Sequence, residues 1–254
     1  MNKLKKFIPW IIPVLLIIFW QLSAVVGILD TKVIPSPLQV IQQGIKLTKN
    51  GTLPKNIAVS LYRATLGFLL GGSIGFVLGM ANALSTLSRN LLDSTIQMIR
   101  NIPHLALLPL FIVWFGIGEP AKVYLVALGV MFPIYINTYN GIKNVSPDLI
   151  EMGQLYQLSR SKMFKKIIFP GALPSILVGV RYALGVMWTT LIVAETVNAK
   201  SGLGYMATDA QNFANTKTLI LVVVMYAILG KLSDSIAKFL EEELLSWQVG
   251  EVKA

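Results

Sequence analysis

Six long apolar stretches constrain the fold of this chain more than any other feature. An α-helix needs about 20 residues to cross roughly 30 Å of hydrocarbon, and each stretch is long enough. Because lipid offers no hydrogen bonds to a bare backbone, only helices or closed barrels cross it. The sequence therefore predicts an all-α integral membrane protein with about six transmembrane helices. The stretches are Phe7–Leu29, Ala64–Leu87, Leu91–Gly118, Val123–Ile142, Gly171–Ala194 and Thr218–Leu240.

The composition agrees with a membrane protein and excludes several kinds of site. Charged residues make up 13% of the chain, about half of the ~25% that soluble domains carry. There is no cysteine and only one histidine, His104, so neither a disulfide nor a multi-histidine metal site is expected. No phosphate-binding loop or nucleophile motif is found, so the sequence predicts no catalytic or metal site. Any ATP hydrolysis would belong to another chain.

The net charge of +10 indicates an orientation in the membrane rather than a nucleic-acid partner, because the basic residues lie mainly between apolar stretches. Lysines at positions 3, 5 and 6 precede the first stretch, which is too long for a signal peptide. A second basic group occupies residues 143–166. The positive-inside rule then places both termini and residues 143–169 in the cytoplasm. Residues 30–62 would lie outside, although they carry four lysines: Lys32, Lys46, Lys49 and Lys55.

We expect three parts along the chain. Residues 1–56 form an N-terminal transmembrane helix and an external segment, in which an apolar-periodic run after Pro37 predicts a short helix along the outer surface. Residues 57–241 form the membrane core, and residues 242–254 form a cytoplasmic tail.

Polar residues interrupt the third stretch. Arg100 and His104 are four residues apart, a spacing that places them on one helix face, and Pro103 should bend the helix. Ionisable side chains within membrane reach rarely face lipid. We therefore predict that Arg100, Asn101 and His104 meet an anionic solute on its path. The alternative is that Arg100 pairs with a structural carboxylate or reaches the inner interface.

The fifth stretch ends at Glu195, just before a glycine-rich turn at Ser201–Tyr205. We place Glu195 among the candidate solute-path residues, as a hydrogen-bond acceptor at an outer gate. It could instead form an ion pair with Arg63 or remain an interfacial charge in water.

Glycines at 67, 71, 75 and 79 form a stripe along one face of the second stretch. Small residues at this spacing let two helix backbones approach closely in lipid. Packing within the bundle is the main interpretation, and sliding of this helix during gating is the alternative.

The polar, basic segment Glu151–Pro174 lies between two apolar stretches and must therefore lie outside the bilayer. Its composition suits a docking surface for a soluble partner. It is similar to the cytoplasmic coupling loop of ABC-importer permeases, in which a Glu-Ala-Ala…Gly motif engages the ATPase. The resemblance extends over almost the whole chain and is strongest from Leu91 to Phe213. It is carried by IRNIPHLALLPLFIVWFG from Ile99, VALGVMFPIYINT from Val126, PGALPSILVGVRYALG from Pro170 and MWTTLIVAET from Met187.

These motifs resemble the permeases of bacterial aliphatic sulfonate ABC importers, in a family that includes taurine, nitrate, and thiamine- or riboflavin-precursor permeases. The resemblance implies the type I ABC-importer permease fold and a coupling loop at 143–169. Gln157 replaces the motif's usual glycine, and this predicts one longer helix across that position. The residues carried over as ATPase-coupling residues are Glu151, Gly153, Ser159, Phe164, Pro170 and Pro174.

The resemblance also implies a function. The chain would be the transport subunit, not an enzyme, of an ATP-driven importer for aliphatic sulfonates in the bacterial inner membrane, or of an importer for one of the related solutes. It would contain no cofactor, because ATP and Mg would bind to the ATPase. Its partners would be a second permease copy, two ATPase subunits, an external substrate-binding protein and the lipid bilayer, with no nucleic acid. A proton-coupled transporter and a membrane enzyme stay open, although few intramembrane acids and no catalytic cluster are found.

Overall fold

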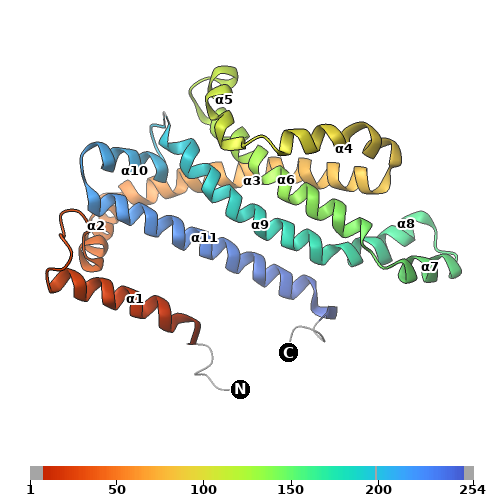
Figure 1. Ribbon diagram of the computed structural model, residues 1–254, viewed down its shortest axis with the longest axis horizontal. Helices are drawn as coiled ribbons and strands as arrows, with labels where there is room; N and C mark the ends of the chain where they lie inside the picture. Colours follow the sequence, from red (N-terminus) through yellow and green to blue (C-terminus); the bar gives the residue numbers. More distant parts are fainter. Residues whose placement is uncertain (1–7, 198, 249–254) are drawn as a thin grey trace.

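The computed structural model describes residues 8–197 and 199–248, and most of those residues are helical while none lies in a strand. The expectations for the N-terminal lysines and for residues 249–254 of the tail lie outside this range. Four helices are long and apolar enough to cross a membrane, and they run side by side through the molecule (Figure 1). They confirm four of the predicted spans. They are α3 (Thr52–Leu84), α6 (Glu119–Lys143), α9 (Phe169–Thr196) and α11 (Thr216–Leu244).

The N-terminal part contains two helices. The apolar helix α1 (Ile8–Val25) is shorter than the stretch that predicted it. The expected surface helix is α2 (Pro37–Lys49), whose N-terminus is closed by a capping box between Ser36 and Gln39. Its side chains Leu38, Ile41 and Ile45 form an exposed apolar stripe, as in a helix that lies in a membrane interface.

The third predicted span is bent at Pro103, as expected. It consists of α4 (Thr86–Arg100), a 3₁₀ turn η2 (His104–Leu107) and α5 (Leu108–Phe115), with a bend of 84° between the two arms. The break falls at Pro103, which lacks a backbone N–H and disfavours helical geometry at the residue before it.

The remaining elements gather at the two ends of the bundle. Figure 1 shows α2 and α10 (Leu203–Asn212) at one end and α7 (Pro147–Leu155) and α8 (Arg160–Met163) at the other. Five residues of π-helix, η3 (Phe164–Ile168), join α8 to α9, so that residues 160–196 form one continuous helical rod. A short 3₁₀ turn, η4 (Ser246–Gln248), follows α11.

The glycine stripe of α3 faces α6 and confirms the packing interpretation. A Cβ added at Gly71 or Gly75 would collide with the backbone carbonyl oxygen of Ala127 or Met131, and one at Gly79 would lie 2.6 Å from the Tyr135 oxygen. Gly141 and Gly179 allow a close, slightly looser contact between α6 and α9, where an added Cβ would lie 2.8 Å from the Ala172 oxygen or 2.6 Å from Asn137 Cβ. The three central helices therefore meet backbone to backbone.

A chain of hydrogen bonds holds α4 against this core. Asn82 of α3 donates to the Tyr135 hydroxyl of α6 at 2.9 Å, and that hydroxyl donates to Asp93 of α4, also at 2.9 Å. Asp93 is a charged residue within the third apolar stretch, and the structure gives it a polar partner within the bundle.

The backbone contact gives a direct test of the core. We expect Gly71→Ala to destabilise the protein by about 1–3 kcal/mol, the usual cost of overpacking, because the colliding group is a carbonyl that cannot rotate away. Thermal unfolding in detergent would measure the loss. Gly230→Ala on α11 is the matched control, since no atom lies within 4 Å of its added Cβ. Equal melting temperatures for the two variants would contradict the packing model.

Candidate functional site

The segment between α6 and α9 presents an exposed apolar patch at one end of the bundle. Leu149 and Met152 are exposed on α7, and Leu155 and Tyr156 at its end are 78% and 76% exposed. Glu151 is exposed within this patch. Exposed apolar side chains outside a membrane indicate a surface that another protein covers.

Gly153 shapes this segment from the inside. It is the buried residue of α7, and an added Cβ would lie 2.6 Å from Ile167 Cδ1 and 2.7 Å from Met163 Sδ. The absence of a side chain lets α7 lie directly on the start of the long rod. A displacement of α7 is therefore transmitted to the helical rod of residues 160–196 through van der Waals contact.

Gln157 does not continue the helix, so the prediction of one longer helix was wrong. α7 ends at Leu155, and Gln157 takes a left-handed conformation with φ of 51°. The Gln157 N–H donates to the Gln154 carbonyl and the Leu158 N–H donates to the Gly153 carbonyl. These bonds form a Schellman motif with Gln157 at the position that glycine usually occupies.

The other coupling candidates have clear structural roles. Ser159 caps the N-terminus of α8 by accepting from the Lys162 N–H, and Phe164 packs on Phe169 with ring centroids 6.0 Å apart. Pro170 follows the π-helical turn, where its missing N–H leaves the regular bonding pattern incomplete.

Glu151 lies within α7 and not at its start, because α7 begins at Pro147 and Asp148 is the acid of its first turn. Pro170 and Pro174 do not start a new helix at the membrane, because both lie within the continuous rod.

A buried ion-pair network occupies the opposite end of the bundle. Arg63 of α3 is 1% exposed and donates to Glu195 of α9 at 2.7 Å, and Glu195 is fully buried. The second carboxylate partner of Arg63 is Glu119 at the start of α6, with a 2.5 Å contact and a 54% exposed side chain. The ion-pair alternative for Glu195 therefore has the right geometry, and Glu195 is not an interfacial charge in water.

This network also holds the glycine-rich turn before α10. The N–H groups of Gly202, Leu203 and Gly204 donate to Asn56, Ser60 and Glu195, at 2.7–2.9 Å. A Cβ at Gly202 would collide with the Glu195 carboxylate. The turn, α3 and α9 are thus locked to one another at this end.

The three path candidates near Pro103 are not brought together as predicted. Arg100 ends α4, Asn101 is its C-cap, and both are exposed. His104 lies past the break and contacts Thr190 of α9, with 2.9 Å between Nε2 and Oγ1. The shared helix face expected for Arg100 and His104 does not exist. Among the residues that the structure describes, Arg100 has no ion-pair partner.

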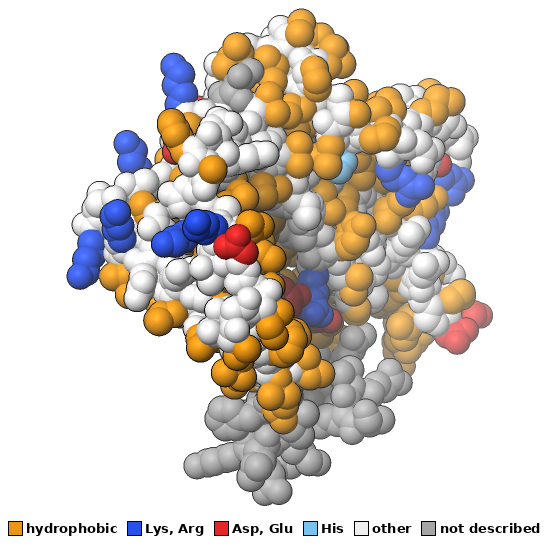
Figure 2. All heavy atoms as spheres, turned by 60° about the vertical axis from the view of Figure 1, so that its left-hand side comes forward, with side chains coloured by type: hydrophobic (Ala, Val, Ile, Leu, Met, Phe, Trp, Pro, Cys, Tyr) orange, Lys and Arg blue, Asp and Glu red, His pale blue; other side chains and the backbone are white. Residues whose placement is uncertain are grey.

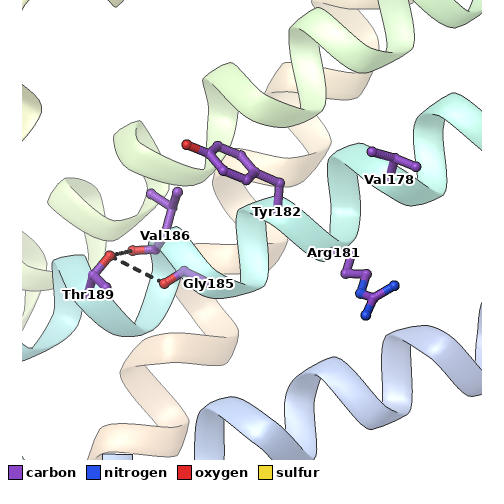
Figure 3. A pocket seen from close by; sticks show the side chains of 6 residues that line it. All are labelled: Val178, Arg181, Tyr182, Gly185, Val186 and Thr189. Atoms are coloured by element: carbon purple, nitrogen blue, oxygen red, sulfur yellow. Dashed lines mark hydrogen bonds between the residues drawn. The ribbon is translucent and has the colours of Figure 1, made fainter. Parts of the chain in front are cut away.

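One face of α9 is open along the middle of the molecule. A hollow of about 580 Å³ lies over Val178, Arg181, Tyr182, Gly185, Val186 and Thr189 (Figure 3). Arg181 points toward α11, where it pairs with Asp234 at 2.5 Å, whereas Tyr182 points to the other side and is 66% exposed. The face mixes apolar and polar groups, unlike a purely lipid-facing surface.

Comparison with known proteins assigns the family. Residues 71–245 match the model of the binding-protein-dependent transport system inner membrane component. The chain belongs to this family. It is therefore a multi-pass membrane protein and a component of a transport system rather than an enzyme.

Two curated relatives of this inner membrane component align with nearly the whole chain. It is 50% identical over 96% of its length to the "Putative aliphatic sulfonates transport permease protein SsuC" of Escherichia coli K12, covering 93% of that protein. It is 34% identical over 94% of its length to the taurine transport system permease protein of the same organism, covering 88% of that protein.

A solved structure supports the fold. A chain of an amino acid ABC transporter superposes with a TM-score of 0.66 at 18% identity, over 78% of this chain and 96% of that one. This likeness confirms the ABC-importer permease fold of the inner membrane component.

Sequence reasoning missed most of the buried network. Asn56 and Ser60 lie seven and three residues before Arg63, so the three share a helix face that continues into the glycine stripe. That spacing was the available signal. No such spacing indicated Glu119, because its partner Arg63 is 56 residues away in the chain.

The apolar patch on α7 generates a test of coupling. We expect Glu151→Lys to leave the protein inserted and assembled but to reduce stimulation of a partner ATPase at least tenfold, because it reverses a charge inside the exposed apolar patch. Substrate-stimulated ATPase activity in proteoliposomes is the measurement. Glu243→Lys is the control, since Glu243 is an exposed acid on α11 outside the patch. Normal stimulation in Glu151→Lys would remove this residue from coupling.

The buried network generates a test of stability. Glu195→Gln should cost about 3 kcal/mol, because removing one partner of a buried pair leaves the other charge poorly compensated. Glu119→Gln removes an exposed partner of the same arginine and should cost about 1 kcal/mol or less. Chemical unfolding in detergent would compare the two, and equal losses would show that burial of Glu195 is not what stabilises this end.

Proposed function

We propose that this chain is the membrane-spanning permease subunit of an ATP-driven importer of aliphatic sulfonates. Two copies would assemble with two ATPase subunits, which bind ATP and Mg, and with an external binding protein. Both termini and the α7–η3 segment would face the cytoplasm of a bacterial cell, and α2 and α10 would face outward.

The observation that carries the substrate assignment is the gradient of identity among relatives. Identity is 50% and 40% to proteins named as aliphatic sulfonate permeases, 34% to a taurine permease and 29% to a nitrate permease. All four alignments cover at least 82% of this chain. A sulfonate solute is therefore favoured over taurine or nitrate.

The arrangement of the two ends supports alternating access without chemistry on the solute. The apolar patch on α7 suits contact with an ATPase, and the rod of residues 160–196 connects that contact to the buried pair at the other end. Closing of the ATPase pair on ATP would displace α7, and the rod would pass the displacement to the outer end. ATP can drive this displacement only if the complex binds ATP more tightly in one of its two conformations than in the other.

The open face of α9 supports a solute path between two copies. Gly185 has no atom within 4 Å of an added Cβ, and Tyr182 and Thr189 offer hydroxyl groups beside it. A second copy opposite this face would enclose the path and bury its exposed apolar groups. Arg181 is already paired with Asp234, so this face would offer the solute several weak contacts instead of one strong ion pair. Weak contacts let the solute leave the path as well as enter it.

Reconstitution tests the proposal as a whole. Proteoliposomes containing this permease and its ATPase, with the binding protein added outside, should take up radiolabelled alkanesulfonate in an ATP-dependent manner and faster than taurine or nitrate. Preference for taurine or nitrate would overturn the substrate assignment. Uptake driven by a proton gradient without the ATPase would overturn the transport class.

Arg100 provides a test of the path. We expect Arg100→Gln to reduce sulfonate uptake about tenfold, with assembly and basal ATPase activity unchanged, because an exposed arginine attracts an anion more strongly near a low-dielectric region than in water. Arg89→Gln, on the same helix α4, is the control and should transport normally. Uptake near the wild-type rate in Arg100→Gln would make Arg100 structural.

A further inference from the structure

A group of four charged side chains lies on α9 and α11, in a part of the molecule where apolar groups alone could pack the two helices. Arg181 is the only charged residue of the apolar stretch Gly171–Ala194 and lies near the middle of α9. In Figure 2, hydrophobic and uncharged side chains cover most of the visible face, and charged ones form only small groups. Ionisable side chains within membrane spans are rare, pair with one another and mark the paths of solutes.

Asp234 is the centre of this charged group. Its Oδ1 accepts a hydrogen bond from the Nε of Arg181 at 2.5 Å, and its Oδ2 lies 3.2 Å from the ammonium of Lys231. The fourth member, Glu241, lies 3.8 Å from Nη1 of Arg181, which is too far for a hydrogen bond. Two positive and two negative charges leave the group without net charge. Among the residues that the structure describes, the carboxylate of Asp234 is therefore the one strong partner of Arg181.

A second contact holds Asp234 opposite Arg181. The indole Nε1 of Trp188, two turns further along α9, donates to Ser233 Oγ at 2.9 Å. Because Ser233 is next to Asp234 in α11, this hydrogen bond sets the register of the two helices close to the ion pair. Arg181 is consequently held toward α11, whereas Tyr182 points to the other side of α9 (Figure 3).

The ion pair borders the hollow that supports the proposed solute path. Arg181 lines this hollow of about 580 Å³ together with Tyr182 and Thr189. Its side chain is 45% exposed, and that of Asp234 is 33% exposed. An anion in the hollow would therefore meet a guanidinium whose charge Asp234 already balances.

We infer that Asp234 is a positioning residue that determines how tightly the path holds an anion. Attraction between unit charges is many times stronger in a low-dielectric interior than in water, so an unbalanced arginine beside the hollow would hold a sulfonate too long. A permeating ion must bind strongly enough to enter and weakly enough to leave. By balancing Arg181, Asp234 would keep the sulfonate from being trapped. This inference rests on the proposed function and adds to it the residue that sets the strength of solute binding.

A purely structural role for the pair fits these observations less well. Arg181 and Asp234 are partly exposed on the hollow, whereas the pair of Arg63 and Glu195 is almost fully buried. The buried apolar cluster of the core includes Leu229 of α11 as well as residues of α9. The packing of the two helices therefore does not depend on the ion pair alone.

Binding of butanesulfonate to the permease–ATPase complex in nanodiscs, without the binding protein, tests the inference directly. Asp234→Asn removes the balancing charge but keeps the shape of the side chain, so it should bind radiolabelled butanesulfonate about tenfold more tightly than the wild type. Neutral butanesulfonamide should gain no affinity, because the effect depends on charge. In proteoliposomes, the same variant should take up butanesulfonate more slowly than the wild type at saturating concentrations of the loaded binding protein.

The double variant Arg181→Gln and Asp234→Asn separates this role from a structural one. It has no unbalanced arginine, so it should bind as weakly as the wild type and transport faster than Asp234→Asn alone. Asp234→Glu keeps the charge and should also bind weakly. Glu242→Gln is the matched control and should change neither readout, because Glu242 is an exposed acid of α11 whose partner is Lys238, outside the hollow.

The inference is wrong if Asp234→Asn binds butanesulfonate no more tightly than the wild type, or if the double variant transports as slowly as Asp234→Asn. Failure of Asp234→Asn to assemble would equally assign the pair a structural role. Equal gains for butanesulfonate and butanesulfonamide would exclude the effect of charge. Uptake by the wild type in the same proteoliposomes decides the proposed function separately, since its presence leaves that function standing after any of these results and its absence overturns it.

Discussion

The close backbone contact between α3 and α6 is the constraint on which the rest of the structure depends. Helix association in lipid gains little from the hydrophobic effect, because lipid tails are as apolar as the side chains. Contact of glycine with the carbonyls of Ala127 and Met131 replaces that driving force with dense van der Waals packing. α9 joins the same core through Gly141 and Gly179. The ends of these three helices then fix where each functional group lies.

The polar interactions fix how the helices of this core are aligned along their length. The buried pair of Arg63 and Glu195 joins α3 to α9 at one end, and hydrogen bonds through Asn82 and Tyr135 hold α4 at the other end of α3. Buried ion pairs contribute less to net stability than their geometry suggests, because desolvation offsets the attraction. Their value here is specificity, since a shift of one turn between α3 and α9 would separate the buried Glu195 carboxylate from its cation in a low-dielectric interior, while Arg63 kept only Glu119.

Much of this fold could be predicted from the sequence, and the failures have physical reasons. Hydropathy predicted the four long helices, because length and apolar content alone decide whether a helix can span a membrane. The glycine stripe predicted a close helix contact but not its partner, since a stripe carries no information about the opposite surface. The bend of the third span at Pro103 was predicted, but its size of 84° was not, because the loss of one backbone hydrogen bond does not fix a bend angle.

The candidate site was harder to predict than the fold. The positions of the coupling motif were found, but the conformation of Gln157 was misjudged because glutamine favours helices in isolation. The Schellman bonds and the packing of Gly153 on Ile167 override that preference. Arg63 and Glu195 could be suspected as a pair, whereas Glu119 could not. Their proximity depends on how three separate helices end.

The continuous rod of residues 160–196 connects these features mechanically. Its 37 residues correspond to about 55 Å of helix at 1.5 Å per residue, which is longer than the hydrocarbon core. Gly153 contacts one end of the rod, and Glu195 forms the buried pair at the other. Hydrogen bonds along a helix resist stretching, so axial displacement at one end must reach the other, while bending concentrates at the π-helical turn and at Pro174. Because Glu195 also holds the Gly202–Gly204 turn, a movement that starts at α7 can reach the opposite end of the bundle through one continuous helix.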